Sequence, residues 1–115
     1  MIKRKNEYTV QQNENMRGGE GTVVIKHLLT PEELYEKGRL YAVLVLEPGC
    51  SVGSHIHEGE MESYYIVKGE AEVSDNGNLQ TVSAGDSVLT RNGEEHSIKN
   101  IGTDTLEVMA LIIYN

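Results

Sequence analysis

Short runs rich in β-branched residues and separated by glycines are the feature that most restricts the fold of this 115-residue chain. Valine and isoleucine together number 19, whereas alanine numbers only 4. This balance favours strands over helices, because β-branched side chains pack well on a pleated surface. The runs predict strands at 22–29, 40–46, 63–68, 70–74, 79–82, 87–90, 96–100 and 106–114. Many short strands at such even spacing are typical of an all-β sandwich or barrel.

Local turn signals punctuate this pattern. The dipeptide Asn76-Gly77 lies between two predicted strands and accepts the positive φ angles of a hairpin turn. One helical signal is present at 30–38, where Thr30 is a predicted N-cap, Glu33 completes a capping box and Gly38 is the stop. We therefore expect a β-barrel with a single short helical turn.

The chain has the length of one domain, and 38% hydrophobic residues can form one core without disulfides or metal. Residues 1–16 are polar and show no sustained periodicity, so they are interpreted as an N-terminal arm. Such an arm is either a frayed terminus or a strand added to the sheet edge of another subunit. Residues 17–115 are expected to form the single barrel domain.

The charge balance excludes some partners. The net charge is −8, and the basic residues form no cluster beyond Lys3-Arg4-Lys5, whereas nucleic-acid binding needs a positive surface. No apolar run approaches the ~20 residues of a membrane-spanning helix. The single cysteine, Cys50, cannot form an intramolecular disulfide, and the N-terminus has no secretory leader pattern. We expect a cytoplasmic protein without nucleic-acid or membrane partners.

Two windows of the chain contain candidate metal ligands. His55 and His57 are separated by one residue, so on a strand both side chains leave the same face and can share one metal ion. A turn at Gly59 would allow Glu62, on the next strand, to return a carboxylate to the same point. His96 opens another predicted strand and could close the site from across a barrel.

The spacing of these residues and of nearby glycines resembles the two motifs of the cupin superfamily. The first motif is matched by Gly49, His55, His57, Glu62 and Gly69, and the second by Gly85, Gly93, His96 and Asn100. Arg91 stands where the family pattern has proline. Proline shapes a turn there and binds no metal, so this departure affects the rigidity of the loop and leaves the ligand set intact.

The resemblance implies a conical β-barrel, or jelly roll, that holds a divalent transition metal through His55, His57, Glu62 and His96. It also implies a likeness to small single-domain bacterial cupins, which are commonly dimers and of which some are labelled oxalate-decarboxylase-like. Three imidazoles and one carboxylate leave two octahedral positions open, which suits Mn, Fe, Ni or Co, with Mn or Fe first, and admits Zn or Cu. Such a centre keeps a formal charge near +1 and favours small anions with two adjacent oxygens.

Strand alternation predicts which neighbours of the ligands face the cavity. Tyr64 has the same parity as Glu62, so it should point inward together with Ile66, while Tyr65 and Val67 should point outward. Tyr64 is therefore a candidate proton donor near the metal. The alternative is a tyrosine that only fills the barrel core.

Charged residues in two loops are further candidates. Arg91, Glu94 and Glu95 precede the histidine of the second motif and could reach the barrel mouth to grip or protonate an anion. A solvated charged loop is the alternative for these three residues. Glu58 and Glu60 are interpreted in the same way, with the solvated turn preferred more strongly.

Three functions remain open at this point. The first is a metal-dependent enzyme that acts on a small oxygen-rich anion by decarboxylation, oxygenation or isomerisation. The second is a non-catalytic module that binds a small ligand or a metal. The third is a metal-free structural barrel.

Overall fold

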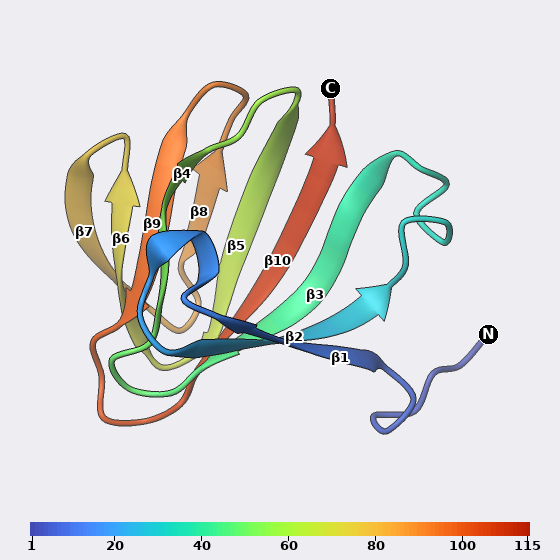
Figure 1. The fold of residues 1–115 in the computed structure, drawn as a ribbon, viewed down its shortest axis with the longest axis horizontal. Helices are drawn as coiled ribbons and strands as arrows, with labels where there is room; N and C mark the ends of the chain where they lie inside the picture. The colour runs from blue at the N-terminus through green and yellow to red at the C-terminus, as the bar shows by residue number, and fades with distance from the viewer.

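Two antiparallel sheets make up the computed structural model, which describes all 115 residues (Figure 1). One sheet has six strands in the order β1-β2-β3-β10-β5-β8, and the other has four in the order β4-β9-β6-β7. The larger sheet contains β1 (Thr9–Glu14), β2 (Thr22–Leu29), β3 (Gly38–Leu46), β10 (Leu106–Tyr114), β5 (Glu60–Lys68) and β8 (Ser87–Thr90). The smaller sheet contains β4 (Ser51–Ile56), β9 (Glu95–Asn100), β6 (Glu70–Asp75) and β7 (Asn78–Ser83). The predicted all-β jelly roll is confirmed.

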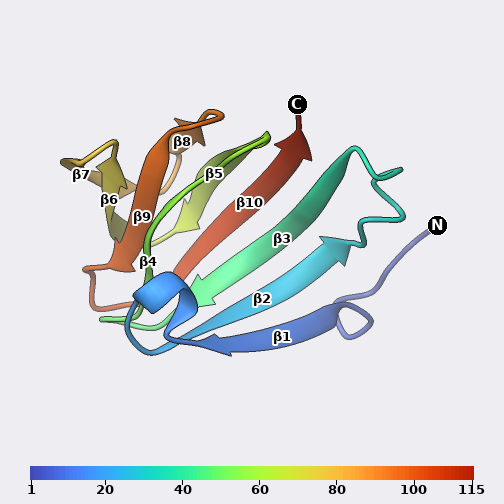
Figure 2. The same cartoon turned by 45° about the horizontal axis from the view of Figure 1, so that its top comes forward.

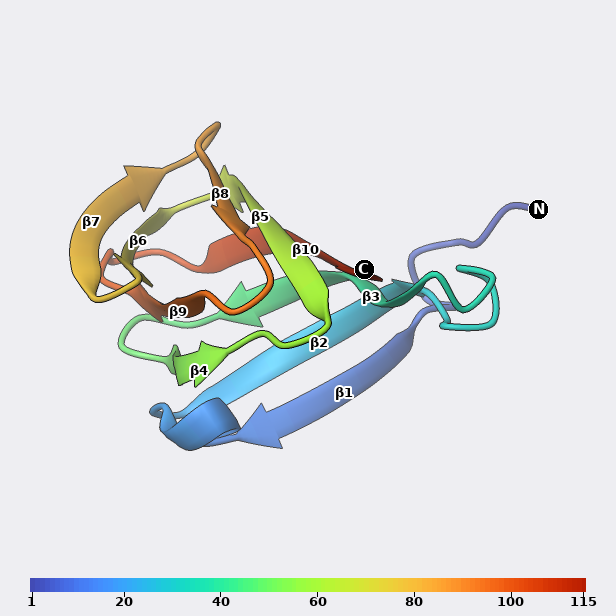
Figure 3. The same ribbon diagram turned by 90° about the horizontal axis from the view of Figure 1, so that it is seen from above.

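The chain crosses between the sheets, so residues distant in sequence meet. In Figure 2 the strands β1, β2, β3, β10 and β5 lie side by side, and the one-turn 3-10 helix η1 (Met16–Gly18) lies beside β4. Figure 3 shows the smaller sheet gathered on one side, with β1 and β2 extending beyond it to the side where the N-terminus lies. No helix of the structure has the length and apolar character that a membrane span requires.

The core lies between the two sheets and consists of alternate side chains of the facing strands. Leu44 and Ile66 from the larger sheet, with Val73 and Ile98 from the smaller one, are at most 2% exposed. Burial of each such side chain stabilises the fold by about 1.5–3 kcal/mol. The predicted parity of β5 is confirmed, because Tyr64 and Ile66 are buried while Tyr65 and Val67 are 50% and 45% exposed.

The segment with the helical signal forms hydrogen-bonded turns and no α-helix. Its capping box is present, with the Glu33 amide donating to Thr30 Oγ1 (3.1 Å) and the Thr30 amide to a Glu33 carboxylate oxygen (2.9 Å). The Leu34 amide also reaches the Thr30 carbonyl, which closes a single turn. Tyr35 and Glu36 then adopt left-handed φ angles of 54° and 56°, so the helical path stops after that turn.

Part of the predicted N-terminal arm forms β1, which pairs with β2 of the same chain from Thr9–His27 to Glu14–Thr22. The segment thus extends the sheet of its own chain. Its polar sequence suits an edge strand, where one row of backbone groups faces solvent and the side chains need not be apolar. Alternation of apolar residues is therefore absent from β1, which is why the sequence pattern did not predict it.

Candidate metal centre

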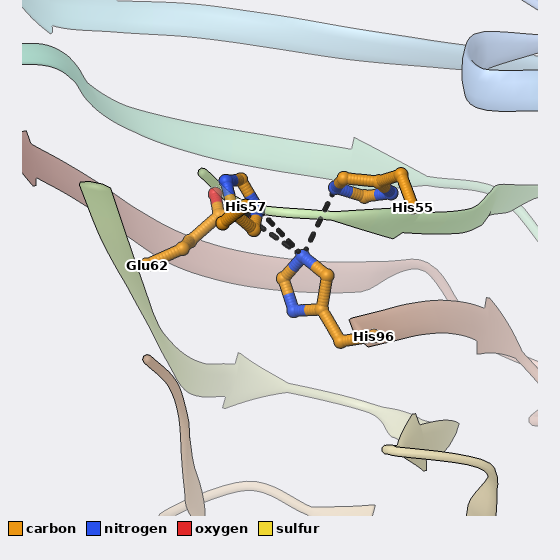
Figure 4. Close-up of side chains that lie close together, drawn as sticks. All are labelled: His55, His57, Glu62 and His96. Atoms are coloured by element: carbon orange, nitrogen blue, oxygen red, sulfur yellow. Dashed lines mark hydrogen bonds and ion pairs between the residues drawn. The ribbon is translucent and has the colours of Figure 1, made fainter. Parts of the chain in front are cut away.

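Three imidazoles and one carboxylate converge between β4, β5 and β9 (Figure 4). We call them the metal cluster: His55, His57, Glu62 and His96. All four ligand atoms lie within 4.8 Å of one another. His96 Nε2 is 3.0 Å from His57 Nε2 and 3.1 Å from His55 Nε2. One carboxylate oxygen of Glu62 is 2.9 Å from His57 Nε2 and 3.0 Å from His96 Nε2.

Strand pairing places these residues. In the register of β4 and β9, His55 lies opposite His96, and a bulge between Val52 and His55 adjusts the first strand. His57 follows the end of β4, and its amide donates to the Glu94 carbonyl at 3.2 Å. Its carbonyl accepts from the Gly93 amide at 2.6 Å. The turn after the first two histidines is thereby joined to the loop that precedes the third.

The Nδ1 atom of each histidine has its own partner, which orients the ring. His55 Nδ1 lies 2.7 Å from the Gly53 carbonyl, and His57 Nδ1 lies 2.6 Å from a Glu60 oxygen. A carbonyl and an ionised carboxylate only accept, so both Nδ1 atoms carry a proton, and in the neutral form of each ring the Nε2 lone pair is the one left to bind a metal. The third ring is held by Thr90, whose Oγ1 is 2.8 Å from His96 Nδ1.

The donor set fits a divalent transition metal. Imidazole nitrogens and carboxylate oxygens bind such ions at about 2.1 Å, so two ligands at right angles are about 3.0 Å apart. Four pairs of ligand atoms in the cluster are 2.9–3.1 Å apart, and all lie within 4.8 Å. Nitrogen lone pairs at this separation repel each other unless a cation lies between them. The cluster is therefore compatible with a divalent ion.

Glu60 is buried and contacts a histidine of the cluster, whereas we expected it to lie in a solvated turn. It is only 8% exposed and lies between His57 and Arg39. Arg39 binds its carboxylate through two hydrogen bonds of 2.8 and 2.7 Å and holds the pKa of Glu60 below its ordinary value. Glu60 has the same strand parity as Glu62 and Tyr64, and this signal in the sequence could have identified it as inward-facing.

Hydrogen bonds within the cluster shift its pKa values in different directions. Burial lowers the pKa of His55. The hydrogen bond to Glu62 raises the pKa of His57. Burial alone would raise the pKa of Glu62, but hydrogen bonds to His57 and His96 outweigh it and hold that pKa below its ordinary value. Glu62 is therefore an anion at neutral pH, as a metal ligand requires.

Tyr64 lies directly against the cluster. Its ring stacks on the ring of His96 with centroids 4.9 Å apart and planes 12° apart. Burial, with Glu62 nearby, raises the pKa of the Tyr64 phenol well above 10. The phenol therefore keeps its proton at neutral pH.

The charged residues of the loop before β9, and Glu95 at the first position of β9, make their contacts away from the cluster. The Glu94 carboxylate accepts from the Arg91 amide (2.6 Å) and from the Asn76 side chain (3.0 Å). The Glu95 carboxylate accepts from the Ser54 hydroxyl (2.7 Å) and from groups of the β6–β7 hairpin. None of Arg91, Glu94 and Glu95 lines the cavity at the cluster. Their contacts brace the loop.

A cavity of about 600 Å³ opens beside the cluster. His55, His57, Glu62 and Tyr64 line its floor together with apolar core residues, and β1 and η1 supply much of its other wall. Two arginines, Arg17 and Arg39, are part of its lining. Neither was predicted as a site residue from the sequence, because each is distant in sequence from both motifs.

Comparison with known proteins agrees with this architecture. The Cupin domain model matches residues 42–114. An oxalate-binding protein of Thermotoga maritima is 49% identical over 113 residues, which are 98% of this chain and 93% of that protein. The crystal structure of a predicted oxalate decarboxylase from Thermotoga maritima has a TM-score of 0.95 at 48% identity and covers 100% of both chains.

A more distant likeness concerns the fold alone. The Cnp3 cupin domain of Schizosaccharomyces pombe is 17% identical with a TM-score of 0.74, over 93% of this chain and 70% of that one. The family model spans more than half of the chain, and the Thermotoga maritima protein is similar over almost all of it. The chain therefore belongs to the cupin family.

Proposed function

We propose that this protein holds a divalent transition metal at the metal cluster and binds a small chelating dicarboxylate, such as oxalate, beside it. The observation that carries the proposal is the convergence of three Nε2 atoms and one carboxylate oxygen within 4.8 Å, with four contacts of 2.9–3.1 Å among them. The name of the Thermotoga maritima oxalate-binding protein supports the choice of anion. Manganese or iron is our first expectation for the metal.

The residues of the chain have separate tasks in this proposal. The Gly53 carbonyl and Glu60 orient two imidazoles, and Thr90 orients the third. Tyr64 covers one face of His96 with its ring and shields that side from water. The bound metal would act as a Lewis acid that polarises the oxygens of the anion.

Turnover of the bound anion is the second candidate function. Decarboxylation of oxalate releases carbon dioxide, and the carbon left behind must receive a proton to give formate. Of the four residues predicted as catalytic, only Tyr64 lines the cavity, so we propose its phenol as the donor. Because Arg91, Glu94 and Glu95 lie outside that lining, the geometry favours binding over turnover.

Metal analysis of the purified protein followed by calorimetric titration with oxalate tests the proposal. We expect one transition metal per chain and oxalate binding only by the metal-loaded form. His96→Ala should lose both, because it removes the nitrogen that contacts the other three ligands. The absence of stoichiometric metal, or unchanged metal binding in His96→Ala, would contradict the proposal. Formate or other products from oxalate, keto acids or catechols would establish catalysis.

We also propose that the protein is a cytoplasmic homodimer. Tyr65, Val67 and Leu89 are 50%, 45% and 42% exposed on β5 and β8, where a second copy could cover them. The single unpaired thiol of Cys50 agrees with a reducing compartment. The mass in solution, measured by light scattering, tests the dimer.

A further inference from the structure

Arg17 brings an unpaired cation to the cavity beside the metal cluster. Arg17 lines the same cavity as His55, His57 and Glu62. The ion pairs of the chain all join other residues, and the Arg17 side chain takes part in none of its hydrogen bonds. The second arginine of the cavity, Arg39, is neutralised by Glu60. A free guanidinium therefore remains available to a ligand.

Hydrogen bonds anchor the turn that carries this arginine. The Gly19 amide donates to the Met16 carbonyl (2.9 Å), and the Asn15 side chain donates to the Gly19 carbonyl (3.0 Å). Ser51, the first residue of β4, accepts at its hydroxyl from the Glu20 amide and donates its own amide to the Glu20 carbonyl, both at 2.8 Å. Hydrogen bonds within the turn and hydrogen bonds to β4 thus hold the turn in place.

Two glycines allow the turn to lie directly on β4. A Cβ atom on Gly53 would overlap the Arg17 carbonyl oxygen, and a Cβ atom on Gly19 would overlap the backbone of β4. The backbone of Arg17 is therefore packed against the strand two residues before His55. Arg17 itself has left-handed angles of φ 55° and ψ 30°, which non-glycine residues adopt uncommonly. Its position follows from specific packing of the backbone.

Neither carboxylate of the cavity lining neutralises Arg17. Glu62 is paired with His57 and His96. Glu14 also lines the cavity, but it forms no ion pair with Arg17.

We propose that Arg17 binds the outward-facing carboxylate oxygens of the dicarboxylate held at the metal cluster, and so selects dianions over monoanions. This inference rests on the proposed function and names the residue that recognises the second negative charge of the ligand. A guanidinium can donate two parallel hydrogen bonds, one to each outward-facing oxygen of a chelated dicarboxylate, whereas a ligand with a single carboxylate offers only one such oxygen. A divalent ion and Glu62 leave a formal charge near +1, and Arg17 adds another, which together match a dianion.

Calorimetric titration of the metal-loaded protein with two chelating ligands tests this role. Oxalate has two carboxylates, whereas glycolate has one carboxylate and a hydroxyl. We expect Arg17→Gln to weaken oxalate binding by about 10- to 100-fold, since a hydrogen bond to a charged group contributes that much. Glycolate binding should change by less than about threefold, and metal content should stay the same. Arg17→Lys keeps the charge but loses the paired hydrogen bonds, so we expect an intermediate affinity.

Variants at two other arginines serve as comparisons in this experiment. Arg4→Gln changes an arginine of the exposed N-terminal segment and should bind both ligands like the unchanged protein. A loss of oxalate affinity in Arg91→Gln, but not in Arg17→Gln, would overturn the proposal in favour of the loop before β9. Equal losses for oxalate and glycolate in Arg17→Gln would overturn it as well, because they would indicate no selection for the second charge.

Failure of the inference and failure of the proposed function give different results. If the metal-loaded protein binds oxalate and Arg17→Gln binds it equally well, the role of Arg17 is wrong while the proposed function stands. If the metal-loaded protein does not bind oxalate at all, the proposed function is wrong and the inference falls with it. Thermal unfolding of each variant verifies that the fold is retained.

Discussion

Two stretches of the chain place acidic residues beside a histidine of the metal cluster, and the structure uses them differently. In residues 58–62, Glu60 turns inward and is bound between His57 and Arg39. In residues 91–95, Glu94 and Glu95 are bound by amides and hydroxyls of the loop and of the β6–β7 hairpin. The difference shows that strand face and nearby donors, and not closeness in sequence, decide whether a carboxylate reaches the site.

Acidification is expected to have the largest effect, because it removes the metal entirely. Binding requires three neutral imidazoles and an ionised Glu62, so protons compete with the metal as the pH falls below ~6.5, the ordinary pKa of imidazole. Metal content measured after dialysis at a series of pH values should decline to nearly zero by about pH 4. A metal content that stays constant down to that pH would contradict metal binding at the cluster.

Removal of Glu60 is expected to have the next largest effect. Glu60→Ala leaves the His57 Nδ1 proton and the Arg39 guanidinium without their partner, so metal affinity should fall by about 10- to 100-fold. The apo protein should lose about 2 kcal/mol of unfolding free energy, less than for a fully buried pair, because the Arg39 side chain is 37% exposed. Chelator competition and urea unfolding measure these two quantities.

The control for Glu60→Ala is Glu58→Ala, which removes an exposed carboxylate from the same stretch and should change neither quantity appreciably. Measuring the unfolding free energy as the pH is lowered also tests the direction of the Glu60 contribution. Arg39 lowers the pKa of Glu60 in the folded state, so Glu60 stabilises the apo protein above its ordinary pKa of about 4.3. This contribution is lost as the pH falls through the lowered pKa. Glu60→Ala should therefore flatten the acid limb of the stability curve.

Loss of the Thr90 hydroxyl should have a moderate effect. Thr90→Val keeps the shape of the side chain but leaves His96 Nδ1 without its partner at 2.8 Å. Metal affinity should fall by about tenfold, because outer hydrogen bonds orient ligand histidines. Ser63→Ala is the control, since Ser63 lies on the neighbouring strand β5 and its side chain makes no hydrogen bond. Equal affinities for Thr90→Val and the unchanged protein would show that His96 needs no such support.

Changes at the start of β9 should have the smallest effect on metal binding. Glu95→Gln keeps an oxygen that can accept from Ser54, so the unfolding free energy should fall by less than about 1 kcal/mol. Metal affinity should stay within about threefold of the unchanged protein. A loss as large as that of Glu60→Ala would mean that the two stretches support the site equally, and the contrast between them would be wrong.

The sequence predicts the strands, and it also predicts the four candidate ligands that the structure brings together, for a local reason. Strand parity places His55 and His57 on one side, and it also predicted that Tyr64 faces inward while Tyr65 faces outward. Two signals were less informative. The capping box at Thr30 forms, but the left-handed residues after Leu34 end the turn. The polar strand β1 has no apolar alternation that could reveal it.

The sequence by itself determined the all-β class, the cupin motifs and the set of candidate ligands, because each depends on alternation or spacing within a few residues. Only the tertiary structure decided which charged groups surround those ligands. Arg39 meets Glu60 across 21 positions, and Arg17 reaches the cavity because η1 packs on β4 at Gly53. Such contacts depend on the register of strands that are distant in sequence and on close backbone packing, and neither follows from any local pattern.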